Sequence, residues 1–345
     1  MSTAGQYTYQ EIVGQGEAWA ASLADVEVEG KLAHWVRNHW TETLFTGCGS
    51  TYYLSESAAA IWRAWTGEPA RAVPGSELWL FPSTVQPQAG SLLVTVSRSG
   101  ETTETLRAID QFEALVGRDW LTVTCHADRP MARRAPHALV ARQAEEQSVA
   151  QTRSFTSMLI LTQVLAALAG GRSLRHLAEL PAHAARLIQT YESLAQSLAN
   201  DAGIRRFTFL GSGVNYGLAC EAMLKMKEMS LSPSEAFHTL EYRHGPKSVV
   251  GPDLLIVGLV SDTAHAHESA VLAEMRDLGA RVLAVAETAH GLTADHVIEL
   301  GSGLDEISRA PLTLPVLQLL AYYRALANGM DPDRPTNLEQ VIRLE

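Results

Sequence analysis

The sequence predicts an α/β protein with two tandem domains, each built on a doubly wound parallel sheet. Short apolar runs such as 92–96 and 254–259 alternate with amphipathic stretches, as strands and helices do in parallel sheets. Residues 209–218 match residues 45–54 at a constant offset, with Phe, two glycines, Tyr and Leu in common. The length of 345 residues is sufficient for two domains with full cores.

The amino-acid composition excludes several classes of protein. Hydrophobic residues make up 46% of the chain and charged residues 19%, which is typical of a globular protein and not of a disordered one. The net charge of −11 argues against a nucleic-acid partner. Cys48, Cys125 and Cys220 lie far apart without a CxxC pair, so we expect neither a zinc site nor a disulfide framework. The N-terminus is polar and no run of about 18 apolar residues occurs, so we expect a cytoplasmic protein without a membrane partner.

Residues 1–40 are expected to form a leading helical segment, because apolar residues recur there at helical spacing. The β-prone run that follows ends in Gly47-Cys48-Gly49-Ser50-Thr51 and precedes an amphipathic stretch at 55–65. The third glycine of a dinucleotide fingerprint is missing, so a nicotinamide cofactor is the weaker interpretation of this loop.

A polar turn at 97–102 (Ser-Arg-Ser-Gly-Glu-Thr) separates the strand at 92–96 from a helix expected to end near Val116. Hydroxyls, a guanidinium and backbone N–H groups at a helix N-terminus suit a dianionic phosphate. The alternative is an ordinary capped loop without a ligand. Ligands of doubly wound sheets bind at the carboxyl ends of the strands, which favours the phosphate site.

The remainder of the first domain, expected at 41–170, follows the same alternation. An edge strand flanked by Pro74 and Pro82 is expected at 72–82. Further elements are expected as strands at 120–124 and 137–140 and as an apolar helix at 158–168 that ends at Gly170-Gly171. A helical connector is expected at 171–200.

The second domain is expected at 201–330, with a tail at 331–345. Its expected strands lie at 254–259, 281–285 and 296–300. The turn that matches 97–102 is 260–263, where Asp262 places an acid in the position expected for phosphate. Only the first copy is therefore expected to bind an anion.

Acid–base candidates lie in the second copy. Glu221 and Lys225 are four residues apart on a helix and are expected to form a surface ion pair. Glu228 lies near the end of that helix, where the helix dipole disfavours an acid. His244 lies in an Arg-His-Gly-Pro turn that presents an imidazole. Glu228 and His244 are thus either a catalytic pair or a helix-end acid and a loop histidine.

The order of these motifs resembles the sugar isomerase (SIS) family. It is most similar to the isomerase half of glucosamine-6-phosphate synthase and to stand-alone aminosugar-phosphate deaminases/isomerases, from about Thr43 to Glu345. The motifs that carry the resemblance are 47–51, 97–102, 146–155, 224–228, 244–246 and 333–338. The resemblance implies two flavodoxin-like SIS domains.

The resemblance also implies roles for individual residues. The implied substrate-binding residues are Ser50, Thr51, Ser97, Arg98, Ser99, Thr102, Val149, Gln151 and Gln340. Glu228 matches the base that moves a proton between C1 and C2, and a carboxylate can both remove and return that proton. His244 matches the ring-opening residue, which in the family reaches into the neighbouring subunit's site. The implied enzyme is a homodimer with a shared active site, and it needs no metal or cofactor because fixed donors can hold the enolate.

Two departures from the synthase bear on the reaction. Nothing in the sequence matches the synthase's N-terminal glutaminase, and Cys48 lies in the sugar loop, so glutamine-dependent synthesis is not expected. Gln340 stands where the synthase has a lysine that forms an imine with the ketose, and an amide cannot form a Schiff base. We therefore expect a substrate that already carries the nitrogen.

The sequence therefore predicts an aminosugar-6-phosphate deaminase/isomerase that forms a ketose-6-phosphate and ammonia from glucosamine-6-phosphate or galactosamine-6-phosphate. A deglycase that cleaves a 6-phosphorylated fructose–amine adduct is the alternative among enzymes. A non-catalytic sugar-phosphate sensor is the alternative of another class, and the presence of both Glu228 and His244 argues against it. Residues 243–248 resemble the branch that acts on galactosamine- and tagatose-6-phosphates, so both C4 configurations are retained.

Overall fold

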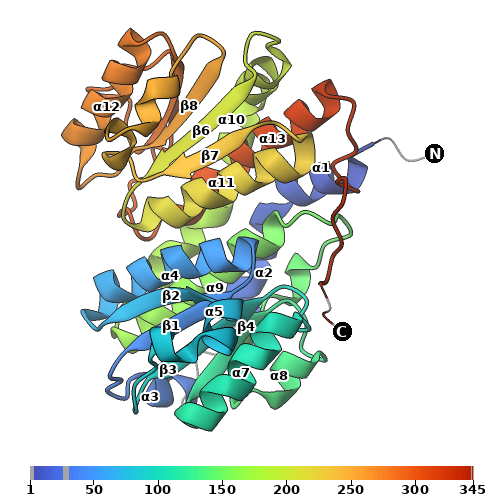
Figure 1. Cartoon of the computed structure of the whole chain (residues 1–345), viewed down its shortest axis with the longest axis vertical. Helices are drawn as coiled ribbons and strands as arrows, with labels where there is room; N and C mark the ends of the chain where they lie inside the picture. Colours follow the sequence, from blue (N-terminus) through green and yellow to red (C-terminus); the bar gives the residue numbers. More distant parts are fainter. Residues whose placement is uncertain (1–3, 26–30, 343, 345) are drawn as a thin grey trace. The chain divides into compact units, whose positions relative to one another are not determined.

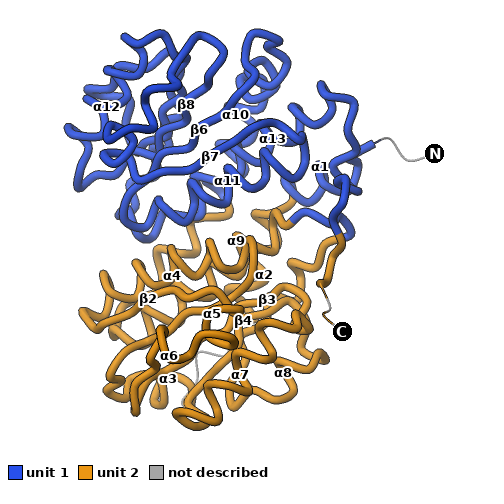
Figure 2. The backbone as a smooth tube through the Cα atoms, viewed as in Figure 1, with its two compact units in different colours: residues 1–13, 147–150, 182–338 blue, residues 14–146, 151–181, 339–345 orange. Residues whose placement is uncertain are grey.

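The computed structural model describes residues 4–25, 31–342 and 344. The chain divides into two compact units, shown in Figure 2. Unit 1 comprises residues 1–13, 147–150 and 182–338, and unit 2 comprises residues 14–146, 151–181 and 339–345. The loop at 147–150 and the C-terminal tail therefore belong to different units from their neighbours in sequence.

Unit 2 contains a five-stranded sheet in the order β2-β1-β3-β4-β5, and every neighbouring pair is parallel. Its strands are β1 (Thr43–Gly47), β2 (Ala70–Pro74), β3 (Leu92–Ser97), β4 (Trp120–Thr124) and β5 (His137–Val140). Every residue of β1, β3 and β4 is buried, because helices cover both faces of the sheet. This burial explains why these strands read as continuous apolar runs.

The helices of unit 2 cover both faces of this sheet (Figure 1). They are α2 (Gln15–Asp25), α3 (Lys31–Val36), α4 (Ser50–Thr66), α5 (Gly75–Leu80), α6 (Pro82–Val85), α7 (Thr103–Leu115), α8 (Pro130–Arg134) and α9 (Arg153–Ala169). Leu44 of β1 packs with Phe112 of α7, whereas the next residue, Phe45, contacts Trp62 of α4. Successive strand residues point to opposite faces, so α7 and α4 lie on opposite sides of the sheet.

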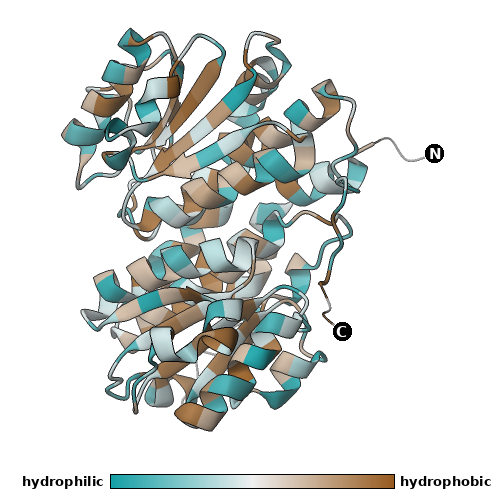
Figure 3. Ribbon diagram, in the orientation of Figure 1, coloured by the Kyte–Doolittle hydropathy of each residue, from teal (hydrophilic) through white to brown (hydrophobic). Residues whose placement is uncertain are grey.

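Unit 1 contains a second five-stranded parallel sheet in the order β10-β9-β8-β6-β7. Its strands are β6 (Arg206–Gly211), β7 (Ser234–Phe237), β8 (Leu254–Leu259), β9 (Arg281–Ala286) and β10 (His296–Glu299). Its helices are α1 (Gln6–Val13), residues 182–200 of α10 (Leu180–Asn200), α11 (Val214–Ser230), α12 (His265–Asp277) and α13 (Leu314–Ala327). In both units the apolar strands are enclosed by helices with hydrophilic outer faces (Figure 3).

Both units therefore have one topology, in which the strand order is 2-1-3-4-5 within each copy. This order confirms the predicted fold class of two doubly wound parallel sheets. The order reverses between the first and third strands of each copy, and ligands of such sheets bind at that reversal. The loop at 48–49 and the turn at 98–102 both leave the sheet there.

Two local predictions were wrong. The strand expected at 72–82 spans only Ala70–Pro74, and the chain then forms α5 and α6. Glu77 in the first turn of α5 and Pro82 at the start of α6 both favour helix. Strand β7 was not predicted, because it is a short edge strand with polar residues that pairs only with β6. Within the expected helical segment at 1–40, residues 1–3 and 26–30 lie outside the described residues.

Gly47 is required by the close approach of β1 to α4. A Cβ atom at this position would lie 2.6 Å from Thr51 Oγ1 and 2.7 Å from the Thr51 carbonyl carbon. We expect Gly47→Ala to lower the free energy of unfolding by about 1–3 kcal/mol, because the backbone of α4 cannot move away without strain. Urea unfolding followed by circular dichroism measures this change.

Gly251→Ala is the matched control. A Cβ at Gly251 meets only Asp253 Oδ1 at 3.5 Å and Arg206 Nη2 at 3.8 Å, which are ordinary contacts. Equal urea midpoints for the two variants would show that the contact at Gly47 does not constrain the fold.

Candidate active site

The loop after β1 is a self-supporting turn. The Cys48 N–H donates to Thr51 Oγ1 at 2.9 Å, and that hydroxyl donates back to the Cys48 carbonyl at 2.9 Å. Gly49 has a φ of 56°, which a glycine adopts without strain. Ser50 and Thr51 are both buried at the start of α4. The predicted contact residue Thr51 therefore lies in the first turn of α4, and its hydroxyl shapes the loop before the helix.

Cys48 is a partly buried thiol in the same loop. Its Sγ lies 3.5 Å from Thr105 Oγ1 at the start of α7. Burial raises the pKa of Cys48 above its usual value. The side chain is therefore a neutral thiol at neutral pH, which does not suit a nucleophile.

The turn after β3 is shaped by its own hydroxyls. Ser97 Oγ accepts the Gly100 N–H at 3.1 Å and lies 3.2 Å from Thr102 Oγ1. Ser99 Oγ accepts the Glu101 N–H at 3.2 Å. The turn leads directly into the thirteen-residue helix α7, whose N-terminus favours an anion. The structure thus brings Ser97, Ser99 and Thr102 together at a helix N-terminus, where we predicted a phosphate.

The predicted site residue Arg98 makes a buried ion pair. Its Nη1 lies 3.1 Å from Glu146 Oε2, and the exposed fractions of the two side chains are 9% and 0%. Glu146 also accepts hydrogen bonds from the backbone N–H groups of Thr152 and Ser154, at 2.6 and 3.0 Å. The pair therefore joins the turn after β3 to the start of α9.

A polar cavity of about 120 Å³ lies beside this turn in unit 2. The cavity is lined by Arg98, Ser99, Glu101, His126, Arg129, Glu145, Glu146, Gln340 and Val341. Arg98 Nη2 lies 3.4 Å from the carbonyl oxygen of Gln340. The C-terminal tail of unit 2 is thereby placed against the turn, as expected if Gln340 contacts the substrate.

The segment before α9 contains the predicted contacts Val149 and Gln151. In unit 1, the Val149 N–H donates to the Asp333 carbonyl at 3.2 Å, and Glu11 of α1 accepts the Gln147 N–H at 2.5 Å. In unit 2, Gln151 Oε1 is buried and accepts no hydrogen bond from the residues that the structure describes. A buried amide oxygen without a hydrogen-bond donor can accept a hydrogen bond from a hydroxyl of a substrate.

The end of α11 contains a buried cation between two acids. Lys225 Nζ contacts Glu228 Oε2 and lies 3.4 Å from Glu221 Oε1. Lys225 and Glu221 have exposed fractions of 1% and 0%, so the predicted surface pair was wrong. Helix α11 packs on α13 within unit 1. Glu228 keeps 19% of its side chain exposed and is the member of the cluster that a substrate can reach.

His244 lies on an exposed loop that is anchored on both sides. Arg243 Nε and Lys247 Nζ both bind Glu274 of α12, at 2.6 and 2.7 Å. The hydrogen bonds to Lys247 and Arg243 hold the pKa of Glu274 below its usual value, so this anchor is charged at neutral pH. Gly245 allows the sharp turn with a φ of 122°. The imidazole is thus presented to solvent from a held loop, as the sequence indicated.

The turn after β8 in unit 1 is already filled by a side chain. The N–H groups of Asp262 and Thr263 donate to Glu306 Oε2 at 2.9 and 3.4 Å. Asp262 also pairs with the buried Arg309. Burial raises the pKa of Glu306. The acid predicted in this turn is present, and a second carboxylate lies where a bound anion would accept hydrogen bonds.

Sequence reasoning missed three charged residues: Lys225 as a buried partner of Glu228, Glu146 as the partner of Arg98, and Glu306 as the group in the second turn. The signal for Lys225 was its spacing of three residues from Glu228, which places both on one face of the helix. The other two pairs are separated by more than forty residues, and no local pattern reveals them.

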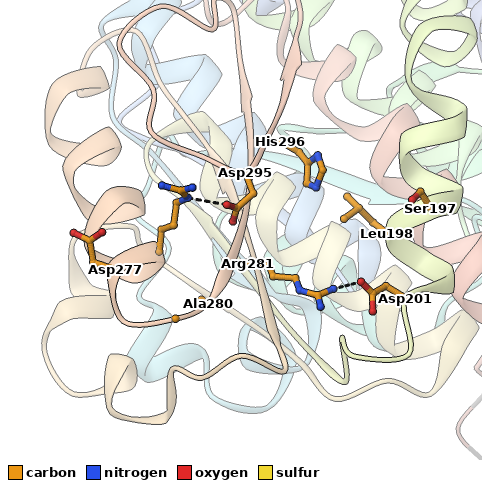
Figure 4. Close-up of a pocket in the computed structure, with 10 residues that line it drawn as sticks. Ser197, Leu198, Asp201, Asp277, Ala280, Arg281, Asp295 and His296 are labelled. Carbon is orange, nitrogen blue, oxygen red and sulfur yellow. Dashed lines mark hydrogen bonds and ion pairs between the residues drawn. The ribbon is translucent and has the colours of Figure 1, made fainter.

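A second, larger hollow of about 550 Å³ lies in unit 1 and contains none of the predicted site residues (Figure 4). It opens at the amino ends of β9 and β10, beside Arg281 and His296. Arg281 pairs there with Asp201, and Arg276 pairs with Asp295. Within unit 1, this hollow is therefore at the opposite edge of the sheet from the turn after β8.

Neither a candidate metal cluster nor a membrane-spanning helix occurs among the residues that the structure describes. Within residues 4–25, 31–342 and 344, no three His, Cys, Asp or Glu side chains gather in a way that could hold a metal ion. None of the helices in this part of the chain has the length and apolar character needed to cross a bilayer.

Comparison with known proteins identifies the family. The model of the SIS domain matches residues 38–168 and 202–327, one match in each repeat. The chain belongs to the SIS domain family. It is 31% identical over 313 residues to a glutamine–fructose-6-phosphate aminotransferase (isomerizing) of Xylella fastidiosa, an alignment that covers 86% of this chain and 51% of that protein. The chain thus spans about half the length of the curated relatives that it matches.

Solved structures give the same family. The glucosamine-6-phosphate deaminase of Thermotoga maritima has a TM-score of 0.81 and 26% identity, and the match covers 98% of this SIS chain and 100% of the deaminase. The tagatose-6-phosphate ketose/aldose isomerase of Escherichia coli has a TM-score of 0.87 at 24% identity, with 96% of each chain covered, and shows the shared fold. This SIS protein is therefore a member of a family of phosphosugar isomerases.

Removing the charge of Lys225 should destabilise the SIS chain. Lys225→Met leaves Glu221 buried without its cation, and we expect a loss of about 3–5 kcal/mol in the free energy of unfolding. Lys227→Met on the same helix removes an exposed charge and should change that free energy by less than about 0.5 kcal/mol. Urea unfolding of both variants measures the difference, and comparable stabilities would argue against a buried ion cluster.

Proposed function

We propose that this SIS protein is an aminosugar-6-phosphate deaminase/isomerase. The observation that carries the proposal is Glu228, a partly exposed carboxylate held by a buried lysine, in a chain whose other repeat offers an open anion turn. A sensor needs only the anion turn, whereas an isomerase also needs a base. The similarity to the glucosamine-6-phosphate deaminase of Thermotoga maritima supports this choice.

The proposed reaction uses four groups of the chain. The hydroxyls of the turn at 97–102 and the N-terminus of α7 bind the 6-phosphate. The His244 imidazole transfers a proton to open the pyranose. Glu228 then removes the proton from C2 of the open aldose and returns it to C1, which converts the 2-amino group to a ketimine. Water hydrolyses this imine, so aminosugar phosphate and water become ketose phosphate and ammonia.

Gln340 supports a substrate that brings its own nitrogen. Its backbone carbonyl lies against Arg98, so the residue is placed beside the anion turn. An amide side chain cannot form a Schiff base with a ketose. Ketose amination through a lysine imine at this position is therefore excluded, whereas imine hydrolysis needs no amine from the protein.

The proposal also includes a homodimer in which His244 serves the partner's site. His244 lies on an exposed loop with two exposed apolar residues of the same segment, Leu240 at 41% and Val249 at 51%. Apolar side chains gathered beside a polar residue are typical of a protein interface.

Ammonia release tests the reaction. Purified protein should release ammonia from glucosamine-6-phosphate or galactosamine-6-phosphate, measured with glutamate dehydrogenase. Glu228→Gln should lower the rate by about 100- to 10 000-fold, because the amide cannot accept the C2 proton. Glu235→Gln, an exposed acid of β7, is the matched control and should leave the rate unchanged.

Two other outcomes would identify a different function, and a third would exclude the proposed base. Amine release from a fructose–amine 6-phosphate without turnover of either aminosugar phosphate would identify a deglycase. Binding of both sugar phosphates without turnover would identify a sensor. Full activity of Glu228→Gln would exclude Glu228 as the base.

Mixing two inactive variants tests the shared site. If His244 acts in the partner's site, a heterodimer of Glu228→Gln and His244→Ala has one site with both residues intact. A mixture of refolded or co-expressed chains should then regain about a quarter of the wild-type activity, because about half of the dimers are mixed. No recovery in a mixture shown to contain heterodimers would place His244 in its own chain's site.

A further inference from the structure

We infer that Arg98 is a positioning residue, which acts through Glu146 and the tail carbonyl of Gln340 and does not bind phosphate by its charge. The inference rests on the proposed function only in assigning the turn at 97–102 to a phosphate. The arginine was expected to line the phosphate site because it stands among the hydroxyls of the turn. Its contacts show that the side chain has another task.

The Arg98 guanidinium is already paired with a carboxylate of the protein. Glu146 Oε2 lies 3.1 Å from Arg98 Nη1, and both side chains are almost wholly buried. A phosphate that recruited this guanidinium would have to compete with a carboxylate that is fixed in place. The Ser97, Ser99 and Thr102 hydroxyls and the N-terminus of α7 remain as the donors of the turn.

Glu146 links the turn at 97–102 to the start of α9. Besides Arg98, its carboxylate accepts the N–H groups of Thr152 and Ser154, at 2.6 and 3.0 Å, and their hydroxyl groups. These residues immediately follow Gln151, the predicted sugar contact. A shift of Arg98 would therefore move the carboxylate that holds the first turn of α9.

The other end of the guanidinium holds the tail. Nη2 lies 3.4 Å from the Gln340 carbonyl, and the tail makes a second contact to the same region, from the Leu344 N–H to Thr103 Oγ1 at 3.2 Å. Arg98, Glu146 and Gln340 line one cavity of about 120 Å³. One side chain thus joins three segments of unit 2: the anion turn, the start of α9 and the C-terminal tail.

The second repeat gives independent support. Arg98 immediately follows β3, and Asp262 lies in the corresponding turn of the second repeat, three residues after the end of β8. Asp262 is also in an ion pair, with the buried Arg309 from the segment before α13. The charges are reversed, and an acid in this turn cannot bind phosphate. Both turns therefore carry an ion pair to a segment more than forty residues further along the chain, before α9 in one repeat and before α13 in the other.

Arg98→Gln and Arg98→Lys test the inference with inorganic phosphate as the probe. A direct charge-assisted contact to phosphate would be worth about 10- to 100-fold in affinity. We expect less than about threefold weakening of the phosphate Kd for either variant, measured by calorimetry. Ser99→Ala should weaken phosphate binding by more than either Arg98 variant.

Hydrogen–deuterium exchange gives the second readout. Both variants should speed exchange of residues 339–342 by about tenfold or more relative to wild type, since the link to the Gln340 carbonyl is lost or lengthened. Arg134→Gln, which breaks the ion pairs of α8 with Asp110 and Glu113 of α7, is the control and should leave this exchange unchanged. In the aminosugar assay, Arg98→Lys should lower kcat more than it raises KM.

Two results would overturn the inference: a loss of phosphate affinity of tenfold or more in Arg98→Lys, or exchange at 339–342 that matches wild type in both variants. Arg98→Lys keeps the positive charge opposite Glu146, so a folded variant is retained if Arg98→Gln fails to fold. The exchange readout needs no substrate. If wild-type protein does not bind phosphate, the proposed function loses its anion turn, and exchange at 339–342 still decides whether Arg98 holds the tail.

Discussion

Strand order reverses between β1 and β3 in unit 2 and between β6 and β8 in unit 1, and the positions of the loop at 48–49 and of the turns at 98–102 and 260–263 depend on that reversal. The helix after β1 crosses one face of the sheet and the helix after β3 crosses the other, so the loops at their starts separate and leave an opening between them. The helix after the first strand must start very close to the sheet, and only a residue without a Cβ fits there. Gly47 and Gly211 satisfy this constraint in the two copies, against Thr51 and Asn215 respectively.

Burial of charge is the second recurring feature, and each instance is compensated by specific partners. Transfer of a lone ammonium or carboxylate to the interior is costly unless the charge is paired and hydrogen-bonded. Lys225 lies between two acids on its own helix, and Glu146 accepts a guanidinium and two backbone N–H groups. Such clusters tolerate little displacement, because a small shift leaves a buried charge without its partner. Lys225 therefore holds the Glu228 carboxylate in one orientation.

The sequence could predict the parts of the structure that depend on local pattern. Central strands such as β3 and β8 are buried on both faces and are therefore continuous apolar runs, from which the fold class could be predicted. The matching glycine loops after β1 and β6 indicated the internal repeat. The edge strands β2 and β7 were misplaced or missed, because an edge strand needs no apolar run. The expected exposure of Lys225 and Glu221 was wrong, because a spacing of four residues predicts an ion pair on a helix but does not show whether that pair faces solvent or the interior. The assignments of substrate contacts to Val149 and Gln151 stay predictions.

Glu306 gives the second repeat a property that the first lacks. It is joined covalently to the turn that it fills, so its effective concentration at the Asp262 and Thr263 N–H groups exceeds that of free solutes at ordinary levels. A phosphorylated metabolite in solution therefore cannot compete for that turn. Duplication of an anion-binding unit would by itself give a protein two binding sites that compete for one substrate. A tethered carboxylate at the Asp262 and Thr263 N–H groups removes one of them.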